Sequence, residues 1–182
     1  LEACFERAPG AVLFSSSSEC YAAGVDAGRV PLPTPEEVDL SISDVREPRW
    51  SYAASKIAGE AFIYSYAQCY DLPFLVFRFS NVYGRYDNDI DRLERVIPLF
   101  IDRIGRGEPI VVYGKDKVLD FTYVDDCVAG VVAGIDALHQ RRIASQTINL
   151  AYGHGNTLMD VVNIISLALG KEPNATFLAS RT

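Results

Sequence analysis

Residues 50–79 read WSYAASKIAGEAFIYSYAQCYDLPFLVFRF, in which a helical pattern leads into an apolar run. One stripe of a helix over residues 50–70 carries small and apolar side chains: Ala53, Ile57, Ala61 and Tyr64. Pro73 ends this helix, because proline lacks the backbone donor that a helix interior needs. Residues 74–79 then have the length and the hydrophobicity of a strand.

Helical and extended patterns alternate along the rest of the chain. Strands are predicted at residues 11–16, 109–113, 121–124, 147–150 and 175–178. Helices are predicted at residues 1–8, 93–104, 128–138 and 157–170, with an N-cap at Asp125 and a capping box formed by Thr157 and Asp160. Residues 24–49 are expected to form a long loop. Because helices connect the strands, the predicted fold class is α/β with a largely parallel sheet.

The composition is that of a globular protein and argues against two classes of partner. The 182 residues are 49% hydrophobic and 23% charged, which is enough to bury a core. The apolar stretches are too short for the roughly 18 residues of a membrane helix, so no membrane partner is expected. The net charge of −7 has the wrong sign for a basic footprint, so no nucleic acid partner is expected.

The cysteines show neither a CxxC pair nor a zinc-like spacing with histidine, and we expect no metal site. Each of the four lies in an apolar stretch: Cys4, Cys20, Cys69 and Cys127. This placement predicts buried free thiols in a reducing, cytoplasmic environment. His139 and His154 are expected at the surface.

The stretch SYAASK at residues 51–56 places Tyr52 and Lys56 four residues apart, so both side chains project from one face of the predicted helix. A phenol has a pKa of about 10 in water, and a nearby ammonium group stabilises the phenolate. Such a pair can therefore serve as a general base. The spacing also arises by chance, so the pair alone leaves a structural interpretation open.

Further motifs surround this pair in a defined order. FSSSSECY spans residues 14–21, and RFSNVYG spans residues 78–84. Later motifs are VIP at 96–98, VVYG at 111–114, DFTYVDD at 120–126 and INLA at 148–151. Together they resemble the extended short-chain dehydrogenase/reductase family, in its NAD-dependent epimerase/dehydratase branch that acts on nucleotide sugars.

The resemblance implies NAD as cofactor, a nucleotide-sugar substrate and a Rossmann-like doubly wound parallel sheet with a smaller C-terminal substrate-binding lobe. The sheet would be incomplete, with its N-terminal half missing. Residues 1–80 would be the remaining part of the NAD-binding domain with the catalytic Tyr and Lys. Residues 81–182 would interleave the substrate-binding lobe with later Rossmann elements.

Residue roles follow from the same resemblance. Tyr52 looks like the catalytic base and Lys56 like the residue that binds the nicotinamide ribose and favours the ionised phenol. Ser17 matches the hydroxyl that hydrogen-bonds the reacting sugar oxygen, and Phe79 is implied at the cofactor. The implied substrate-binding positions are Ser17, Ser18, Glu19, Asn81, Val96, Tyr113 and Arg181. The implied reaction passes through a transient keto-sugar.

Three features depart from the family pattern. No GxxGxxG cofactor fingerprint occurs, so we expect the chain to lack the N-terminal part of the pattern and a shorter piece after Thr182. Leu119 stands where the family commonly has an Arg on the substrate pyrophosphate, and Lys117 is a candidate substitute. Ser18 stands where 4,6-dehydratases carry Asp, which argues against dehydration.

The leading hypothesis is therefore an NAD-dependent epimerase of a nucleotide-linked sugar. The Ser18-Glu19 pair also occurs in decarboxylases of nucleotide-linked uronic acids, so a decarboxylase or a dehydratase of the same family is the alternative. A catalytically silent fragment or a nucleotide-sugar binding module is an alternative of another class. By fold analogy, the helix at residues 50–70 is a candidate surface for a homodimer or for self-association.

Overall fold

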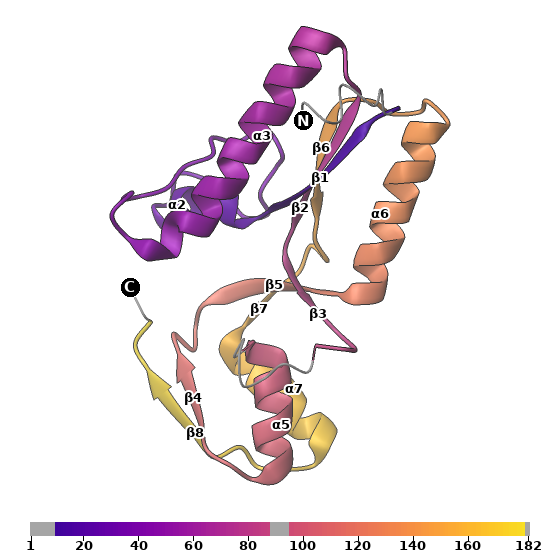
Figure 1. Ribbon diagram of the computed structural model, residues 1–182. Coiled ribbons are helices and arrows are strands. Elements are labelled where there is room, and N and C mark those ends of the chain that lie inside the picture. The colour runs from indigo at the N-terminus through magenta and orange to yellow at the C-terminus, as the bar shows by residue number, and fades with distance from the viewer. Residues whose placement is uncertain (1–9, 88–94, 181–182) are drawn as a thin grey trace. The chain divides into compact units, whose positions relative to one another are not determined.

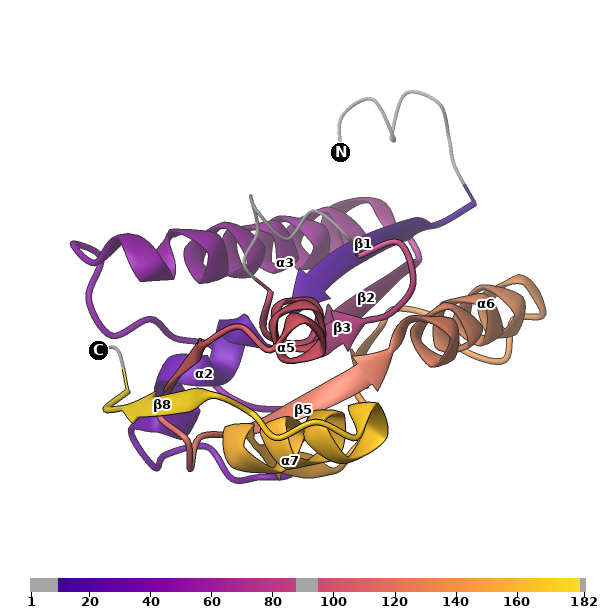
Figure 2. The ribbon, with the colours of Figure 1, turned by 90° about the horizontal axis from the view of Figure 1, so that it is seen from below.

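The computed structural model describes residues 10–87 and 95–180, which form an α/β chain (Figures 1 and 2). The chain divides into two compact units, residues 1–80 with 126–151 and residues 81–125 with 152–182. The predicted fold class is confirmed. The predicted helix at residues 1–8, Cys4 and Arg181 lie outside the described residues.

The first unit is built on a parallel sheet in the order β1-β2-β6. Its strands are β1 (Val12–Ser17), β2 (Phe74–Phe79) and β6 (Gln146–Leu150). Ser17 pairs with Phe79, which in turn pairs with Leu150, so the three strands end side by side. Helices α3 (Ser51–Tyr70) and α6 (Val124–His139) lie on opposite faces of this sheet (Figure 1).

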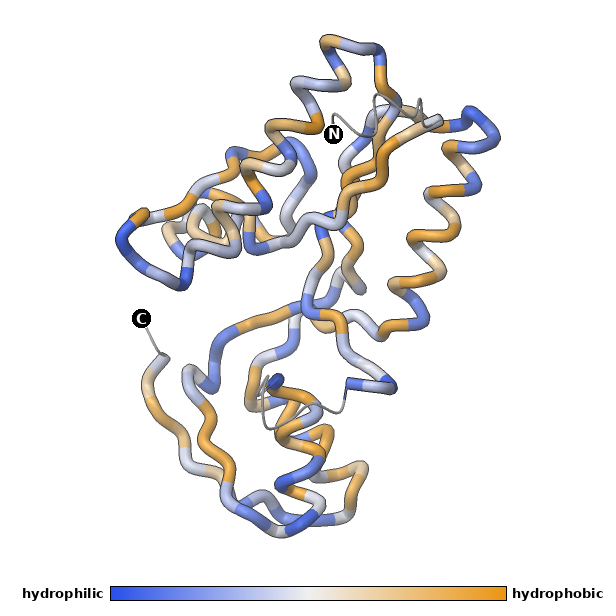
Figure 3. The backbone as a smooth tube through the Cα atoms, viewed as in Figure 1, coloured by the Kyte–Doolittle hydropathy of each residue, from blue (hydrophilic) through white to orange (hydrophobic). Residues whose placement is uncertain are grey.

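Strand β2 is hydrophobic apart from Arg78 because both of its faces are covered, as is usual for parallel strands (Figure 3). Phe74 and Val76 pack against Ile63 of α3. Leu75 and Phe77 point to the other face, where they lie close to α6. The residues between Pro73 and Ser80 thus form the centre of the first unit.

The buried face of α3 differs from the predicted stripe. It passes through Ala53, Glu60 and Ile63, whereas Ala61 and Tyr64 are exposed. The difference arises because Glu60, a charged residue that a hydrophobic pattern excludes, is only 1% exposed.

The predicted loop at residues 24–49 is wrong at its beginning. Helix α2 (Glu19–Asp26) starts directly after β1, and its last residues replace the start of the loop. A short 3-10 turn, η1 (Pro48–Trp50), precedes α3. The remaining residues from 27 to 47 contain neither helix nor strand.

The second unit has an apolar core between two helices and short strands. Its helices are α5 (Val96–Arg106) and α7 (Leu158–Leu169). Its strands are β3 (Asn81–Tyr83), β4 (Ile110–Tyr113), β5 (Val118–Tyr123), β7 (Gly155–Thr157) and β8 (Ala175–Leu178). β4 pairs with β8 and β3 with β5 in parallel, while β5 and β7 are antiparallel. Strands β3 and β7 were not predicted, and β5 begins earlier than predicted.

Two of the predictions concern the first residues of helices. The capping box is confirmed, because Asp160 N–H donates to Thr157 Oγ1 (3.0 Å) and Thr157 N–H donates to Asp160 Oδ2 (2.9 Å). The predicted N-cap at Asp125 is wrong, because α6 already begins at Val124. Asp125 instead forms an ion pair with Arg85.

Among the described residues, the predicted exposure of the cysteines and histidines is confirmed except at Cys69. Cys20 and Cys127 are buried free thiols, as predicted, but Cys69 is exposed near the end of α3. Burial raises the pKa of the Cys127 thiol. Both histidines are exposed. Within the described residues, the helices are all too short or too polar to span a membrane.

Candidate active site

Tyr52 and Lys56 lie on the first two turns of α3 and share a face of the helix, as their spacing predicts. Lys56 Nζ is 5.5 Å from the centre of the Tyr52 ring. It donates a hydrogen bond to the carbonyl oxygen of Ser15 (2.6 Å), which ties this turn of α3 to β1. Tyr52 is 52% exposed, so its phenol is open to a ligand.

Ser17 lies at the carboxyl end of β1, next to the end of β2. Its Oγ accepts a hydrogen bond from the Glu19 N–H (3.2 Å), and Ser18 N–H donates to the carbonyl oxygen of Phe79 (2.9 Å). Ser17 is only 7% exposed, whereas Glu19 is exposed as the first residue of α2. In open α/β sheets, ligands bind beyond the carboxyl ends of the strands. Ser17 and Phe79 both occupy this edge.

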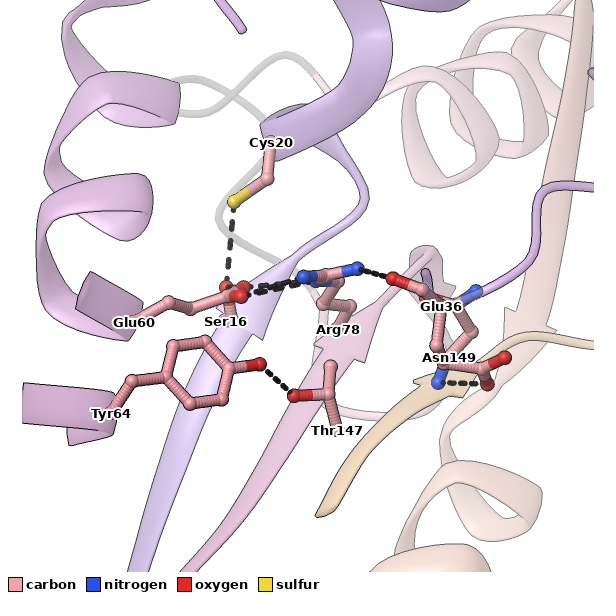
Figure 4. A network of polar contacts seen from close by, with 8 residues as sticks. All are labelled: Ser16, Cys20, Glu36, Glu60, Tyr64, Arg78, Thr147 and Asn149. Carbon is pink, nitrogen blue, oxygen red and sulfur yellow. Dashed lines mark hydrogen bonds and ion pairs between the residues drawn. The ribbon is translucent and has the colours of Figure 1, made fainter. Parts of the chain in front are cut away.

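A buried polar network includes Ser16, the residue before Ser17 in β1 (Figure 4). Ser16 Oγ donates to Glu60 Oε1 (2.5 Å) and lies 3.4 Å from the Cys20 thiol. The Arg78 guanidinium donates to both carboxylate oxygens of Glu60, from Nε to Oε1 (3.0 Å) and from Nη2 to Oε2 (2.7 Å). The network therefore joins α2, β1, α3 and β2.

The same network reaches the edge strand β6 through residues 34–36 (Figure 4). Arg78 Nη1 donates to the carbonyl oxygen of Glu36 (2.8 Å). Glu36 Oε1 accepts the backbone N–H of Asn149 (2.9 Å), and the Asn149 amide donates to the carbonyl oxygen of Thr34 (2.9 Å). The Glu36 carboxylate thus binds a backbone N–H group of β6 that would otherwise be available to pair with a further strand.

Burial and charge act together on the ionisable groups of this network. Burial opposes the charge of Arg78, but the Glu60 carboxylate outweighs it and the pKa of Arg78 is raised. Burial raises the pKa of the Cys20 thiol, which disfavours the reactive thiolate. Glu60 was not predicted as a site residue, although Arg78 offered a signal in the sequence. Arg78 is a charge within an apolar strand, and a buried charge requires a partner.

The other predicted substrate positions lie in the second unit. Asn81 is exposed on β3, and its amide donates to the carbonyl oxygen of Asp120 (2.9 Å). Val96 is the first residue of α5 and packs against the apolar core of this unit. Tyr113 is half-buried at the end of β4. The roles of these residues stay predictions.

The structure explains how a Leu is accommodated at position 119. Leu119 packs against the apolar core of the second unit. A cavity of about 500 Å³ lies beside the turn that precedes it, with Lys115, Lys117 and Phe177 in its lining. Lys117 stays a candidate for the phosphate contact.

The residues of the first unit fit the nicotinamide end of NAD. Lys56 uses one of its three hydrogens on Ser15 and retains two for ribose hydroxyl groups. Tyr52, on the same helix face, is exposed beside it. In residues 10–87 and 95–180, no cluster of three or more His, Cys, Asp or Glu side chains could hold a metal ion.

A family model described as the NAD dependent epimerase/dehydratase family matches residues 1–151. The chain belongs to this family. The predicted family is confirmed, and the fold of the described residues agrees with it.

Individual relatives support the same assignment. The chain is 28% identical over 178 residues to the "Uncharacterized UDP-glucose epimerase YtcB" of Bacillus subtilis, covering 97% of this chain and 50% of that protein. It is 31% identical over 155 residues to a UDP-N-acetyl-alpha-D-glucosaminuronate decarboxylase of Bacillus cytotoxicus, covering 85% of this chain and 44% of the relative.

A solved structure gives the same fold. The UDP-glucose 4-epimerase of Thermus thermophilus, in complex with NAD, matches with a TM-score of 0.77 and 27% identity, covering 99% of this chain and 55% of that structure. The chain spans about half the length of the curated relatives it matches.

Proposed function

We propose that these residues belong to an NAD-dependent epimerase that acts on a nucleotide-linked sugar through a transient keto-sugar. The main support is the arrangement of Tyr52 and Lys56 on one face of α3, with Lys56 bound to β1 two residues before Ser17. The likeness to the Bacillus subtilis protein, which covers nearly the whole chain, points in the same direction.

The chemistry follows from what each side chain can do. NAD, when bound, would supply reversible oxidation of the sugar carbon that carries the reacting hydroxyl. Tyr52 would take the proton of that hydroxyl, and the Lys56 ammonium would favour the phenolate and hold the nicotinamide ribose. Ser17 would donate its hydroxyl hydrogen to the sugar oxygen, since its own oxygen is already oriented by Glu19 N–H. Such orientation of the reactants supplies much of the rate.

The Tyr52→Phe variant of the full-length protein tests this proposal. It removes the ionisable oxygen alone, and we expect turnover of the nucleotide sugar to fall at least about a hundredfold, the contribution of a positioned base. Tyr66→Phe is the control, because it makes the same change further along α3 and should keep wild-type turnover. Wild-type turnover in Tyr52→Phe would contradict the proposal. A protein that binds nucleotide sugars without turning them over would favour the binding-module alternative.

A decarboxylase is the second candidate, because Glu19 is exposed beside Ser17 and one relative bears that name. In a decarboxylase we expect Glu19 to act on the sugar during carboxylate loss, whereas an epimerase would need it mainly for local structure. Release of CO₂ from a nucleotide-linked uronic acid by the wild type, abolished in Glu19→Gln, would replace epimerisation by decarboxylation. Dehydration is less favoured because of Ser18.

The proposal includes an assembly and a location. Phe62 and Tyr70 are exposed on α3, which supports self-association as a homodimer through this helix. Sedimentation of wild type and Phe62→Glu would test this, with dissociation expected in the variant. The buried free thiols of Cys20 and Cys127 suit a reducing, cytoplasmic environment.

A further inference from the structure

The helix face that carries Tyr52 and Lys56 continues to Glu60, since the three residues are spaced four apart. Two successive members of this row bind successive residues of β1. Lys56 Nζ donates to the carbonyl oxygen of Ser15, and Glu60 Oε1 accepts from the hydroxyl of Ser16. The next residue of β1 is Ser17.

Later residues of α3 contact earlier residues of β1, since Gly59 lies against Phe14 and Ile63 belongs to the cluster that includes Val12. Helix α3 therefore runs antiparallel to β1, and its first turns lie at the end of the strand where Ser17 lies.

Glu60 also binds β2, through hydrogen bonds that Nε and Nη2 of Arg78 donate to its two carboxylate oxygens (Figure 4). Glu60 and Arg78 are 1% and 3% exposed, so water cannot replace either partner. If α3 moved along the sheet by one turn, both charges would be left unpaired in the interior, at a cost of several kcal/mol. The contact therefore permits a single position of α3 on the sheet.

The apolar contacts of the same helix fit closely but carry no charge. Ile63 packs against Phe74 and Val76, and Gly59 lies close to the ring of Phe14. Apolar burial is non-directional, so a small shift of these contacts costs less than the loss of a partner by a buried charge. The hydrogen-bonded groups therefore constrain the position of α3 most strongly.

We infer that Glu60 is a positioning residue, which holds α3 against β1 so that the Tyr52–Lys56 pair is presented at the end of the strand where Ser17 lies. Ser16 and Arg78 are its two anchors on the sheet. This inference rests on the proposed function, because the pair must be catalytic for its position to matter.

The test replaces Glu60 and its two anchors by apolar side chains in the full-length protein, as Ser16→Ala, Glu60→Leu and Arg78→Met together. Apolar replacement of a buried ion pair is often neutral or stabilising, so we expect urea unfolding at least as resistant as in the wild type. We expect kcat to fall about tenfold to a hundredfold, as small misplacements of reacting groups do, while KM changes less than about threefold. A stable triple variant with kcat within about twofold of wild type would overturn the inference.

A second measurement needs no bound NAD and no turnover. The rate at which acetic anhydride modifies Lys56, measured by mass spectrometry, should rise several-fold in the triple variant, because the Lys56–Ser15 contact loosens. Lys171, which donates to the carbonyl oxygen of Gly105 in the second unit, is the internal control and should not change. An unchanged Lys56 rate would also count against the inference.

Two further variants keep the test decisive. If the triple variant does not fold, Ser16→Ala alone is compared with Ile63→Val, which weakens an apolar contact of the same helix. We expect kcat to fall in Ser16→Ala and to stay near wild type in Ile63→Val, and equal values would overturn the inference. Failure of the proposed function would instead appear as wild-type turnover in Tyr52→Phe, and the Lys56 acetylation rates would still report the position of α3.

Discussion

The two units bury different kinds of side chain. In the second unit the core is one hydrophobic cluster that consists of Phe100, Ile104, Ile110, Val112, Leu158, Val161, Val162 and Ile165. In the first unit the buried residues include Ser16, Ser17, Glu60 and Arg78, whereas Thr122 is the buried polar residue of the second unit among those the structure describes. The polar interior lies beside the proposed catalytic residues.

The two kinds of buried contact have different effects on how strongly the elements attract one another and on how exactly they are positioned. Apolar contacts stabilise in proportion to the area they bury and tolerate small shifts. Buried charges tolerate no loss of a partner, because the remaining charge is then unpaired away from water. We therefore expect the second unit to respond gradually to substitution and the first unit to respond abruptly.

The largest effect is expected from Glu60→Ala, which leaves the Arg78 guanidinium buried without its carboxylate. Breaking a buried pair on one side typically costs about 3–5 kcal/mol, and urea unfolding of the full-length protein would measure it. The double variant Glu60→Ala with Arg78→Met should recover part of this loss. If the single and double variants are equally destabilised, the unpaired charge is not the cause.

Ile104 provides the matched substitution in the second unit, where it is 1% exposed. Ile104→Val should cost about 1 kcal/mol and Ile104→Ala about 3 kcal/mol, in proportion to the methyl groups removed. Urea unfolding of both variants measures how much free energy of unfolding is lost for each methyl group removed. A loss in Ile104→Val as large as that in Ile104→Ala would show that this core also depends on a single exact contact.

The sequence predicted most of the scaffold but little of this contrast. The long helix α3 and the strand β2 were predictable because their patterns extend over many residues. β3 was not, because three residues carry too little periodicity and its pairing with β5 joins positions 40 apart, such as Asn81 and Phe121. α2 was obscured by a run of serines and by Gly24, which favours loops.

The candidate site also contains residues that the sequence predicts and residues that it does not. Tyr52 and Lys56 were visible because a fixed spacing within one helix places them together. The partners of Glu60 were not, because Ser16 is 44 residues away and Arg78 is 18 residues away in sequence. Only the packing of a helix across two strands brings these groups into contact.

Two glycines, one in each unit, test the comparison through effects of intermediate size. A Cβ at Gly59 would lie 2.3 Å from Cζ of the Phe14 ring, so Gly59→Ala must displace either this ring or α3 and should cost about 1–3 kcal/mol. Gly105 lies in α5 with nothing within 4 Å of the corresponding position, so Gly105→Ala should stabilise by about 0.5–1 kcal/mol through helix propensity. Thermal unfolding of both variants is the measurement. A neutral Gly59→Ala would mean that the contact between α3 and β1 is looser than the structure shows.

The smallest effect is expected at the capping box of α7, where Thr157→Ala should lower the melting temperature of the full-length protein by a few degrees. The hydrogen bond from the Thr157 hydroxyl, and then that from its backbone N–H, holds the pKa of the Asp160 carboxyl below its usual value. A carboxyl whose pKa is lower in the folded state stabilises that state above its unfolded pKa of about 4, and the contribution is lost as the pH falls through the lower, folded value. The difference between wild type and Thr157→Ala should therefore be constant near neutral pH and should shrink below about pH 4. Asp160→Asn, which cannot titrate, should abolish that pH dependence of the difference. A difference that persists unchanged in acid would show that the Thr157 hydroxyl stabilises α7 without the charge of Asp160, through its bond to the Asp160 backbone N–H alone.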